Sequence, residues 1–371
     1  MNILIMTSKF GMGHYYAAEA IKEELCRERP GDNVTVCDCM EMLLGKRAQL
    51  MYAAYSSFVA RGSSIYNHIY RLCTEMDKPC GSGRKGAASA LVSAVRKTVL
   101  AADADVIIST WSGCNKYVGS YISEYRPDMP FITCITDIGI HGTWVNKNID
   151  LYLAASEETK RDLLKIGIGA DKIAVTGIPV RGGFCGSTPE HDCGGREKRL
   201  LVMGGGLGLL PSDRHFYDRL SKMKGLKTTV ITGKNKELLR SFSGKYGSIE
   251  FLPFTENIEA YIKNADWLLT KPGGITTFEA VNAGTPLILA RPDLQQEAAN
   301  SAFVERHGLG VLLGTCIEDG IDAITAALTD SEKQARIKQN MKNMRLSFDA
   351  GALPRYLGSF EKNQEVRENC V

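Results

Sequence analysis

The stretch that decides the fold reads Thr270-Lys271-Pro272-Gly273-Gly274-Ile275-Thr276-Thr277-Phe278-Glu279-Ala280. The apolar run before it predicts a buried strand that ends at Thr270, and a helix is expected to begin at Thr276 or Thr277. The glycines between them let backbone approach a ligand closely, and the free N–H groups of a helix start favour a diphosphate without a metal. Glu279, expected in the first turn, is placed to accept hydrogen bonds from ribose hydroxyls. An ordinary capped helix is the alternative, since Thr followed by Glu is common at helix starts.

Alternation of strand and helix extends from this stretch toward both ends of the chain. Continuous apolar runs predict strands at residues 3–6, 34–36, 106–108, 131–135, 151–154, 200–203, 228–231, 267–270 and 287–290. Helical patterns cover residues 14–29 and 215–224. Runs that are continuous rather than alternating indicate parallel sheets covered on both faces. Because the Gly-rich residues 181–198 are typical of a linker, we expect two α/β domains facing each other across a cleft.

Composition excludes several classes of protein. The 371 residues are enough for two domains, and a net charge of +3 argues against a nucleic-acid partner. Eleven cysteines lack the spacing of a disulfide framework, which favours reduced thiols in a cytosol. No signal peptide or membrane-spanning helix is predicted. The six histidines show no HxxxH or HExxH pattern, so no metal site is predicted.

Two further loops in the second half strengthen the expectation of a nucleotide diphosphate site. Gly204-Gly205-Gly206-Leu207-Gly208 follows a predicted strand and offers backbone amides to phosphate. After residues 287–290, Gln296 and Glu297 supply the paired donors and acceptors that sugar hydroxyls need. Each loop lies at the end of a strand, where open parallel sheets bind ligands.

Several short motifs together resemble glycosyltransferase family 28, in the branch of the plant monogalactosyldiacylglycerol synthases and bacterial processive diacylglycerol glucosyltransferases. Lys-Pro-Gly-Gly-x-Thr-x-x-Glu-Ala begins at Lys271, and Gln-Glu-x-x-Asn begins at Gln296. Further matches are Gly13-His14-x-x-Ala17-Ala18, Thr136-Asp137-Ile138-Gly139 with His141 and Trp144, Ser156-Glu157-Glu158, Gly177-Ile178-Pro179-Val180-Arg181 and Met203-Gly204-Gly205-Gly206. The resemblance covers nearly the whole chain, and the motifs stand in the family's order.

The resemblance implies a GT-B fold and an inverting, metal-independent UDP-sugar hexosyltransferase that uses no cofactor. Residues 1–182 would form an acceptor-binding, membrane-docking domain and residues 183–345 the nucleotide-sugar domain. Residues 346–371 would form a helical tail packed back on the first domain. The implied donor contacts are Gly205, Gly206, Gly274, Ile275 and Thr276 for the diphosphate, Glu279 for ribose, Gln296 and Glu297 for the sugar, and Phe254 for uracil. Gly273 and Asn300 are further donor-binding residues. These residues do not separate UDP-glucose from UDP-galactose.

The N-terminal loop Gly11-Met12-Gly13-His14 carries the candidate general base. A His near a helix N-terminus is biased toward its neutral form, because the helix dipole disfavours imidazolium. Neutral imidazole accepts the proton of the acceptor hydroxyl as its oxygen attacks the anomeric carbon. A plain helix cap is the alternative for a lone His; the resemblance favours the base, although Met12 departs from the family's glycine-rich run.

Other acceptor-side residues follow from the same resemblance. Asp137 is a second catalytic candidate, which would orient His14 or the acceptor, although an Asp in such a loop is commonly a cap or turn residue. The remaining acceptor-binding candidates are Met12, Gly13, Tyr55, Tyr66, His141 and Trp144.

Residues 49–71 combine aromatic and apolar side chains with interleaved arginines. This pattern suits the headgroup boundary of an anionic membrane, and the family carries an acceptor and membrane-docking insertion here. Packing of the aromatic side chains on the sheet is the alternative. With a membrane contact, the protein would be cytoplasmic and peripheral on the inner face of a bacterial cell membrane, with a diacylglycerol-type lipid as acceptor.

Three other functions compete with this prediction. A dehydrogenase would need a third glycine after Gly11-x-Gly13, where Tyr16 stands, and Asp38 alone is insufficient. A related transferase acting on a polyprenyl-linked precursor or a soluble natural product would share the donor half. A sugar-nucleotide epimerase or regulatory binding protein would share the GT-B architecture.

Overall fold

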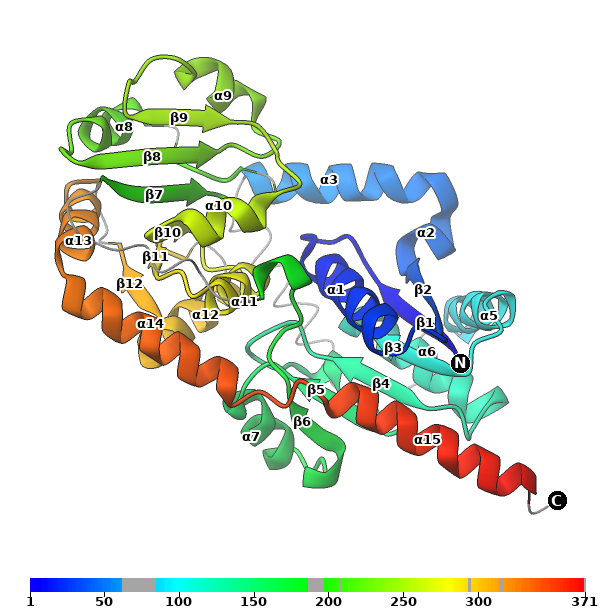
Figure 1. Cartoon of the computed structure of the whole chain (residues 1–371). Helices are drawn as coiled ribbons and strands as arrows, with labels where there is room; N and C mark the ends of the chain where they lie inside the picture. The colour runs from blue at the N-terminus through cyan, green and yellow to red at the C-terminus, as the bar shows by residue number, and fades with distance from the viewer. Residues whose placement is uncertain are drawn as a thin grey trace. The chain divides into compact units, whose positions relative to one another are not determined.

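The computed structural model describes residues 1–61, 85–185, 197–206, 208–211, 213–292, 295–313 and 317–369. The chain divides into two compact units, whose elements are labelled in Figure 1. Unit 1 comprises residues 1–53, 70–181 and 347–371, and unit 2 comprises residues 54–69 and 182–346.

Unit 1 is built on a parallel sheet with strand order β2-β1-β3-β4-β5-β6. Its strands are β1 (Asn2–Thr7), β2 (Asn33–Asp38), β3 (Val106–Ser109), β4 (Phe131–Cys134), β5 (Leu151–Ala154) and β6 (Ile173–Val175). Its helices are α1 (Gly13–Glu28), α2 (Cys39–Leu44), η1 (Gly45–Arg47), α5 (Lys85–Ala101), α6 (Ser112–Tyr125), η2 (Gly142–Trp144), α7 (Glu157–Lys165), η3 (Ala170–Lys172) and α15 (Ala352–Asn369). Helix α3 (Ala48–Arg61) begins in unit 1 and ends in unit 2.

Both faces of the first sheet are covered, as the continuous apolar runs predict. Leu4 and Met6 point to one face and pack with residues of α5 and α6. Ile3 and Ile5 point to the other and pack with α1 and with Leu353 and Leu357 of α15. Full burial of one such side chain contributes about 1.5–3 kcal/mol, so this pair of leucines is enough to hold α15 on the sheet. In the middle of α15, Glu361 adds an ion pair with Arg29 at 2.6 Å.

Unit 2 contains a second parallel sheet, with strand order β12-β11-β10-β7-β8-β9. Its strands are β7 (Lys198–Met203), β8 (Leu226–Ile231), β9 (Ile249–Leu252), β10 (Trp267–Thr270), β11 (Leu287–Leu289) and β12 (Gly310–Leu312). Its helices are η4 (Gly182–Phe184), α8 (Arg214–Ser221), α9 (Lys236–Phe242), α10 (Ile258–Asn264), α11 (Gly274–Ala283), α12 (Gln295–Arg306), α13 (Ile317–Thr329) and α14 (Ser331–Leu346).

The strand order fixes where a ligand site can form in each sheet. In unit 1 the chain turns outward in opposite directions from β1 and β3, and in unit 2 it does so from β7 and β10. At such a switch point the loops after the two strands diverge, and a crevice opens at their carboxyl ends. A ligand site is therefore expected at the loops that follow β1 and β3 in unit 1, and at those that follow β7 and β10 in unit 2.

Every strand predicted from an apolar run coincides with an observed strand, and β5 and β10 match it residue for residue. The short strands β6, β9 and β12 were not predicted. Helix α11 corrects a further expectation, because it begins at Gly274 rather than at Thr276 or Thr277. Glu279 consequently lies in its second turn, not its first. Gly273 takes an extended backbone as the cap residue, which lets the helix start directly after the glycine pair.

Candidate functional site

The loop after β1 turns sharply into α1. Gly11 and Met12 both have left-handed backbones, with φ of 69° and 63°. Met12 is the cap residue of α1 and makes no capping hydrogen bond with its side chain. A left-handed residue other than glycine costs about 1–2 kcal/mol. Met12 thus has a strained backbone two residues before the candidate base, in a conformation that glycine adopts without steric strain.

His14 contacts two threonines, one through its ring and one through its backbone, and these threonines follow β4 and β3. Its Nδ1 is 2.6 Å from Oγ1 of Thr136, in the loop after β4. Its backbone oxygen accepts a hydrogen bond from Oγ1 of Thr110, after β3, at 2.9 Å. Burial lowers the pKa of His14, outweighing the opposite effect of Asp137 and of the Thr110 carbonyl, while His141 lowers it further. His14 is therefore suited to be a neutral proton acceptor at pH 7.

Asp137, His141 and Trp144 form a second cluster beside His14. The Trp144 ring is fully buried, and its Nε1 donates to Oδ2 of Asp137 at 3.1 Å. His141 Nε2 lies 3.5 Å from the same oxygen. Burial disfavours ionisation of Asp137, but contacts with His141, His14 and Trp144 prevail and hold its pKa below the usual range. Among the described residues, Asp137 makes its hydrogen bonds with this cluster and none with the His14 ring.

In unit 2, the start of α11 leaves its first backbone amides without a side-chain cap. Gly273 precedes the helix, and no side chain caps it. Thr277 turns its hydroxyl back onto the Gly273 carbonyl at 2.8 Å. The Thr276 hydroxyl, by contrast, makes no hydrogen bond with any other described residue. Uncapped amides and one hydroxyl without a hydrogen bond to the described residues, at a helix N-terminus, are the ordinary components of a phosphate site.

The glycine-rich loop after β7 closes on itself next to this helix start. Gly208 has a φ of +67°, and a Cβ on it would lie 1.8 Å from the Thr232 carbonyl oxygen, so no other residue fits. Gly205, also left-handed, lies beside Lys271, whose Cε would be 3.6 Å from a Cβ on that glycine. Lys271, which precedes α11, therefore brings its side chain beside the second loop that was expected to hold phosphate.

Helix α12 is tied to the loop that precedes α11. Glu297 is 5% exposed and pairs with Nζ of Lys271 at 3.0 Å. Asn300 is 8% exposed and donates from Nδ2 to the Pro272 carbonyl at 2.9 Å. Residues three apart share one face of a helix, which explains the Glu-x-x-Asn spacing. The side chain of Gln296 lies outside the described residues.

Phe254 follows β9 at the far side of the same sheet edge. Its backbone N–H donates to the Gly233 carbonyl at 3.2 Å, and its side chain is 47% exposed. An exposed aromatic ring is free to stack on a flat ligand. The predicted donor residues thus follow strands β11, β10, β7 and β9, all at the carboxyl edge of one parallel sheet.

Two family models match the chain in succession. The model of monogalactosyldiacylglycerol (MGDG) synthase matches residues 14–180, and that of the glycosyltransferase family 28 C-terminal domain matches residues 200–353. The chain belongs to glycosyltransferase family 28, in the branch of the MGDG synthases. It is therefore a glycosyltransferase, and the first match begins at His14 itself.

Curated relatives align with this glycosyltransferase over most of their length. The processive diacylglycerol beta-glucosyltransferase of Bacillus pumilus is 29% identical over 363 residues, covering 94% of this chain and 92% of the relative. The enzyme of the same name from Bacillus subtilis is 28% identical over 371 residues, covering 93% and 91%.

Solved structures share the fold. MurG of Acinetobacter baumannii superposes with a TM-score of 0.63 at 12% identity, covering 98% of this chain and all of that one. HepE of Anabaena, in complex with UDP and glucose, gives 0.56 at 16% identity, covering 98% and 99%. A putative UDP-N-acetylglucosamine 2-epimerase of Listeria monocytogenes gives 0.60 at 14% identity, covering 98% and 96%. The glycosyltransferase has the GT-B fold, as expected from the sequence.

The segment expected to meet a membrane is described in part. Leu44 and Leu50 are 43% and 74% exposed, with Lys46 and Arg47 exposed between them. Tyr55 is partly buried on α3, whereas Tyr66 lies outside the described residues, together with most of the expected aromatic pattern. Within the described ranges, no helix has both the length and the apolar character to cross a bilayer.

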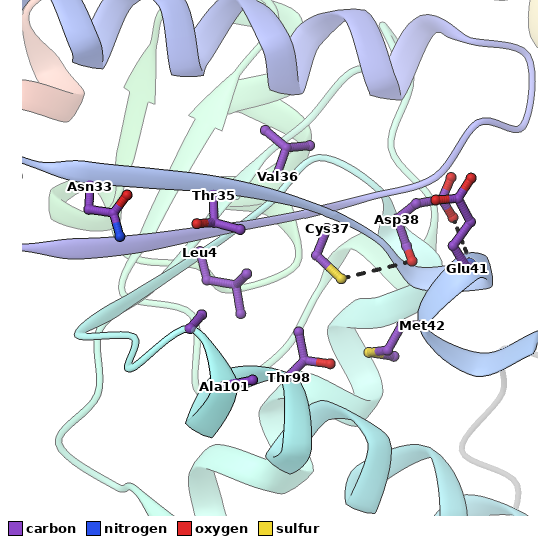
Figure 2. A pocket seen from close by; sticks show the side chains of 11 residues that line it. Leu4, Asn33, Thr35, Val36, Cys37, Asp38, Glu41, Met42, Thr98 and Ala101 are labelled. Atoms are coloured by element: carbon purple, nitrogen blue, oxygen red, sulfur yellow. Dashed lines mark hydrogen bonds between the residues drawn. The ribbon is translucent and has the colours of Figure 1, made fainter. Parts of the chain in front are cut away.

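A hollow of about 450 Å³ runs beside the edge strand β2 of the glycosyltransferase (Figure 2). Its lining includes Leu4, Val36, Met42 and Thr98, with Asp38 and Glu41 at one end, and none of the predicted site residues. Asp38 is occupied structurally, because Oδ1 accepts the backbone N–H groups of Met40 and Glu41 and the Tyr52 hydroxyl. Asp38 is thus the cap of α2.

Two residues at the sites were not singled out from the sequence. Lys271 had no role assigned within its motif, although a lysine two residues before a Gly-Gly helix start is a signal for an anion. In the motif Thr136-Asp137, a role was predicted for the acid and none for Thr136.

Among the described residues, no group of three or more His, Cys, Asp and Glu side chains is arranged to hold a metal ion.

Proposed function

We propose that this glycosyltransferase transfers glucose or galactose from a UDP-sugar to a hydroxyl group of a lipid, 1,2-diacylglycerol, with inversion at the anomeric carbon. The observation that carries the proposal is the order of the predicted donor contacts along one sheet edge. Sugar contacts follow β11, diphosphate contacts follow β10 and β7, and the base contact follows β9 beyond β8. Five neighbouring strands span roughly 19 Å at 4.8 Å per strand, the scale of an extended nucleotide sugar.

The donor would be held chiefly by backbone. The first-turn amides of α11 and the Thr276 hydroxyl face the diphosphate, with Gly205 and Gly206 on its other side. Gly206 is exposed, and its missing side chain leaves open space. Glu279 and Glu297, both nearly buried, would accept hydrogen bonds from the ribose and the sugar. Buried carboxylates that accept from hydroxyls discriminate strongly against ligands that lack them.

The reaction would be a single displacement. The acceptor oxygen bonds to the anomeric carbon, the bond from that carbon to the diphosphate oxygen breaks, and UDP leaves with the electron pair. His14 takes the acceptor proton, for which its lowered pKa keeps the ring neutral. One displacement inverts the configuration of the sugar.

Departure of UDP requires positive charge near its diphosphate, and Lys271 would supply it together with the α11 amides. The ammonium group of Lys271 is paired with Glu297 at 3.0 Å, and its Cε lies beside Gly205 of the loop after β7. We propose that neither a metal nor a cofactor takes part. Exhaustive chelation should then leave the turnover rate unchanged, whereas restoration of a lost rate by Mg²⁺ or Mn²⁺ would contradict this.

A lipid acceptor is supported by the names of the two Bacillus relatives, which are diacylglycerol glucosyltransferases, and by the exposed side chains of Leu44, Lys46, Arg47 and Leu50. Leucines that insert at the headgroup boundary, with cations beside them, are typical of a peripheral membrane protein. We propose that these residues meet the inner face of the cell membrane.

Product analysis tests substrate class. UDP-glucose and UDP-galactose are each incubated with diacylglycerol, ceramide, a polyprenyl phosphate and soluble alcohols, and products are read by mass spectrometry. A hexosyl-diacylglycerol from one donor is the expected result. Products only with the polyprenyl or soluble acceptors would replace the lipid assignment, and conversion of the donor without any acceptor would identify an epimerase.

Flotation with anionic liposomes tests the membrane contact, with a matched control. Leu50→Ser should weaken flotation at low salt, because it removes an exposed apolar anchor next to the cations. Leu346, at the end of α14, is 75% exposed against 74% for Leu50, so Leu346→Ser removes the same surface elsewhere. Equal flotation of both variants and the unaltered protein would count against docking through this segment.

A further inference from the structure

The Thr136 hydroxyl touches two groups at the base of the His14 ring. Its Oγ1 lies 2.6 Å from Nδ1 of His14 and 3.2 Å from the carbonyl oxygen of Thr110. The side chain is 6% exposed, so these protein groups are its immediate polar surroundings. Both contacts are made by a single oxygen that carries a single proton.

The position of that proton follows from the chemistry of the partners. A carbonyl oxygen only accepts, so Thr136 donates its proton to Thr110. The contact with His14 must then be donated by Nδ1–H and accepted by Thr136. A neutral imidazole carries one N–H, and with Nδ1 protonated the lone pair is on Nε2.

We propose that Thr136 is a positioning residue that fixes His14 in the tautomer with a basic Nε2. The inference rests on the proposed role of His14 as the general base. Thr136 contacts Nδ1 of the ring, on which the Thr110 carbonyl also acts, while the Thr110 hydroxyl fixes the backbone of His14 through a 2.9 Å bond to its carbonyl oxygen. The two threonines follow β3, which pairs with β1, and β4, which is the next strand beyond β3, so the tautomer is set by the core of unit 1.

Asp137 does not take this role, although it is the neighbouring residue and ionised. Its Oδ2 receives Trp144 Nε1 at 3.1 Å and lies 3.5 Å from His141 Nε2. Its effect on His14 is a charge effect at longer range, which raises the pKa of the ring against the dominant effect of burial. A neutral hydroxyl in place of a carboxylate as the partner of Nδ1 leaves the imidazole less basic than a paired acid would.

The tautomer is measured directly by long-range proton–nitrogen NMR of the full-length protein labelled with ¹⁵N-histidine. The His14→Ala variant assigns the signals. We expect a protonated Nδ1 and an unprotonated Nε2 in the unaltered protein and in Thr136→Ser, which keeps the hydroxyl. Thr136→Val keeps the shape but loses the acceptor, and should shift His14 toward the other tautomer or a mixture.

Thr143 provides the matched control. Its Oγ1 lies 2.6 Å from Nδ1 of His141, the same contact on a different ring. Thr143→Val should alter the His141 signals and leave those of His14 in place. A His14 with protonated Nε2 in the unaltered protein, or an unchanged His14 tautomer in a folded Thr136→Val, would overturn the proposal. Thermal unfolding of each variant verifies that it is folded.

Turnover then separates this proposal from the one on which it rests. Thr136→Val should lower kcat by about tenfold to a hundredfold, with recovery in Thr136→Ser and with KM for the UDP-sugar within about twofold. A changed tautomer with unchanged kcat would overturn the catalytic meaning of the contact. Near-normal turnover in His14→Ala would instead remove the base itself, and the NMR result for Thr136 would stand apart from it.

Discussion

Unit 1 and unit 2 each bring a tight loop and a helix start to the carboxyl end of a strand, yet the two junctions offer different groups. After β1 the chain passes through left-handed Gly11 and Met12 and presents the side chain of His14, held by Thr136. After β10 it passes through Gly273 into α11 with no side-chain cap, and presents backbone amides. Both strands lie at the switch point of their sheet.

The difference follows from what each half of the reaction needs. Proton transfer needs one side chain whose pKa and tautomer are set by its surroundings, and a packed cluster of threonines with Trp144 provides those surroundings. Binding of a diphosphate needs several donors fixed in advance and no bulk in front of them. One architecture thus serves two chemistries because the loop residues, and not the sheet, decide whether side chain or backbone faces the ligand.

The largest of these effects is expected from a change of pH, because it protonates His14 at the junction of unit 1. The active form of His14 is neutral, so kcat/KM is lost as pH falls through its pKa. Burial, aided by His141 and opposed by Asp137, places that pKa below about 6.5. A plot of kcat/KM against pH should be flat at neutrality and, below the lowered pKa of His14, fall about tenfold per pH unit, or a hundredfold over two units.

Asp137→Asn sharpens the pH measurement. It removes the charge that raises the pKa of His14, so the acid limb should move to still lower pH. A limb above pH 6.5, or a shift to higher pH in this variant, would contradict the arrangement.

The lowered pKa of His14 also affects the free energy of unfolding. Because the unfolded chain binds the His14 proton more readily than the folded one, this residue lowers the free energy of unfolding as pH falls below about 6.5.

Lys271→Met tests the charge at the backbone junction. We expect kcat to fall about thirtyfold, because the departing diphosphate loses its cation, while KM for the acceptor stays the same. Loss of the ion pair with nearly buried Glu297 is a competing cause. The double variant with Glu297→Gln separates the two: recovery of kcat in the double variant would assign the loss to an unpaired Glu297 and not to the diphosphate.

Adjacent threonines of α11 give a finer test of the same junction. Thr276→Val should weaken UDP binding about tenfold in calorimetry, since a hydrogen bond to a charged group contributes about 1.5–3 kcal/mol. Thr277→Val removes a hydroxyl that returns to the Gly273 carbonyl, and should lower stability slightly with UDP affinity within about twofold. Equal losses of affinity in both variants would show that helix stability, not phosphate contact, is being measured.

The smallest effect is expected at Met12. Met12→Gly relieves a left-handed strain of about 1–2 kcal/mol and adds about 0.5–1 kcal/mol of backbone entropy to the unfolded state. Chemical denaturation should show a gain between zero and about 1.5 kcal/mol in the free energy of unfolding. A clear loss of stability would mean that the Met12 side chain contributes packing that outweighs the strain.

The sequence carried the architecture further than the sites. Buried parallel strands such as Leu151–Ala154 and Trp267–Thr270 are predicted from their continuous apolar runs. Three-residue β6 and β12 and half-buried β9 do not, because a few residues with partial burial look like loop. The glycine pair of α11 predicted a ligand loop but hid where the helix begins, since glycine fits both a cap and a first turn.

Contacts between distant residues set the limit at the sites. His14 and Thr136 are 122 positions apart, and nothing in either motif indicates that the hydroxyl rather than the adjacent carboxylate meets the ring. Lys271 and Glu297, 26 positions apart, are both visible in their motifs, but their ion pair appears only once α12 packs beside the loop. Residue type and spacing predict which loops matter, and packing decides which atoms face each other.

The separation of base and phosphate site is tested most directly by His14→Ala, measured for both functions in one preparation. We predict that kcat falls by at least about a hundredfold while the Kd for UDP, from titration calorimetry, changes by less than about twofold. The change in kcat measures the contribution of the His14 side chain in unit 1, and the Kd for UDP measures binding by the backbone amides of unit 2. Near-normal turnover, or a loss of UDP affinity as large as the loss of rate, would contradict the account.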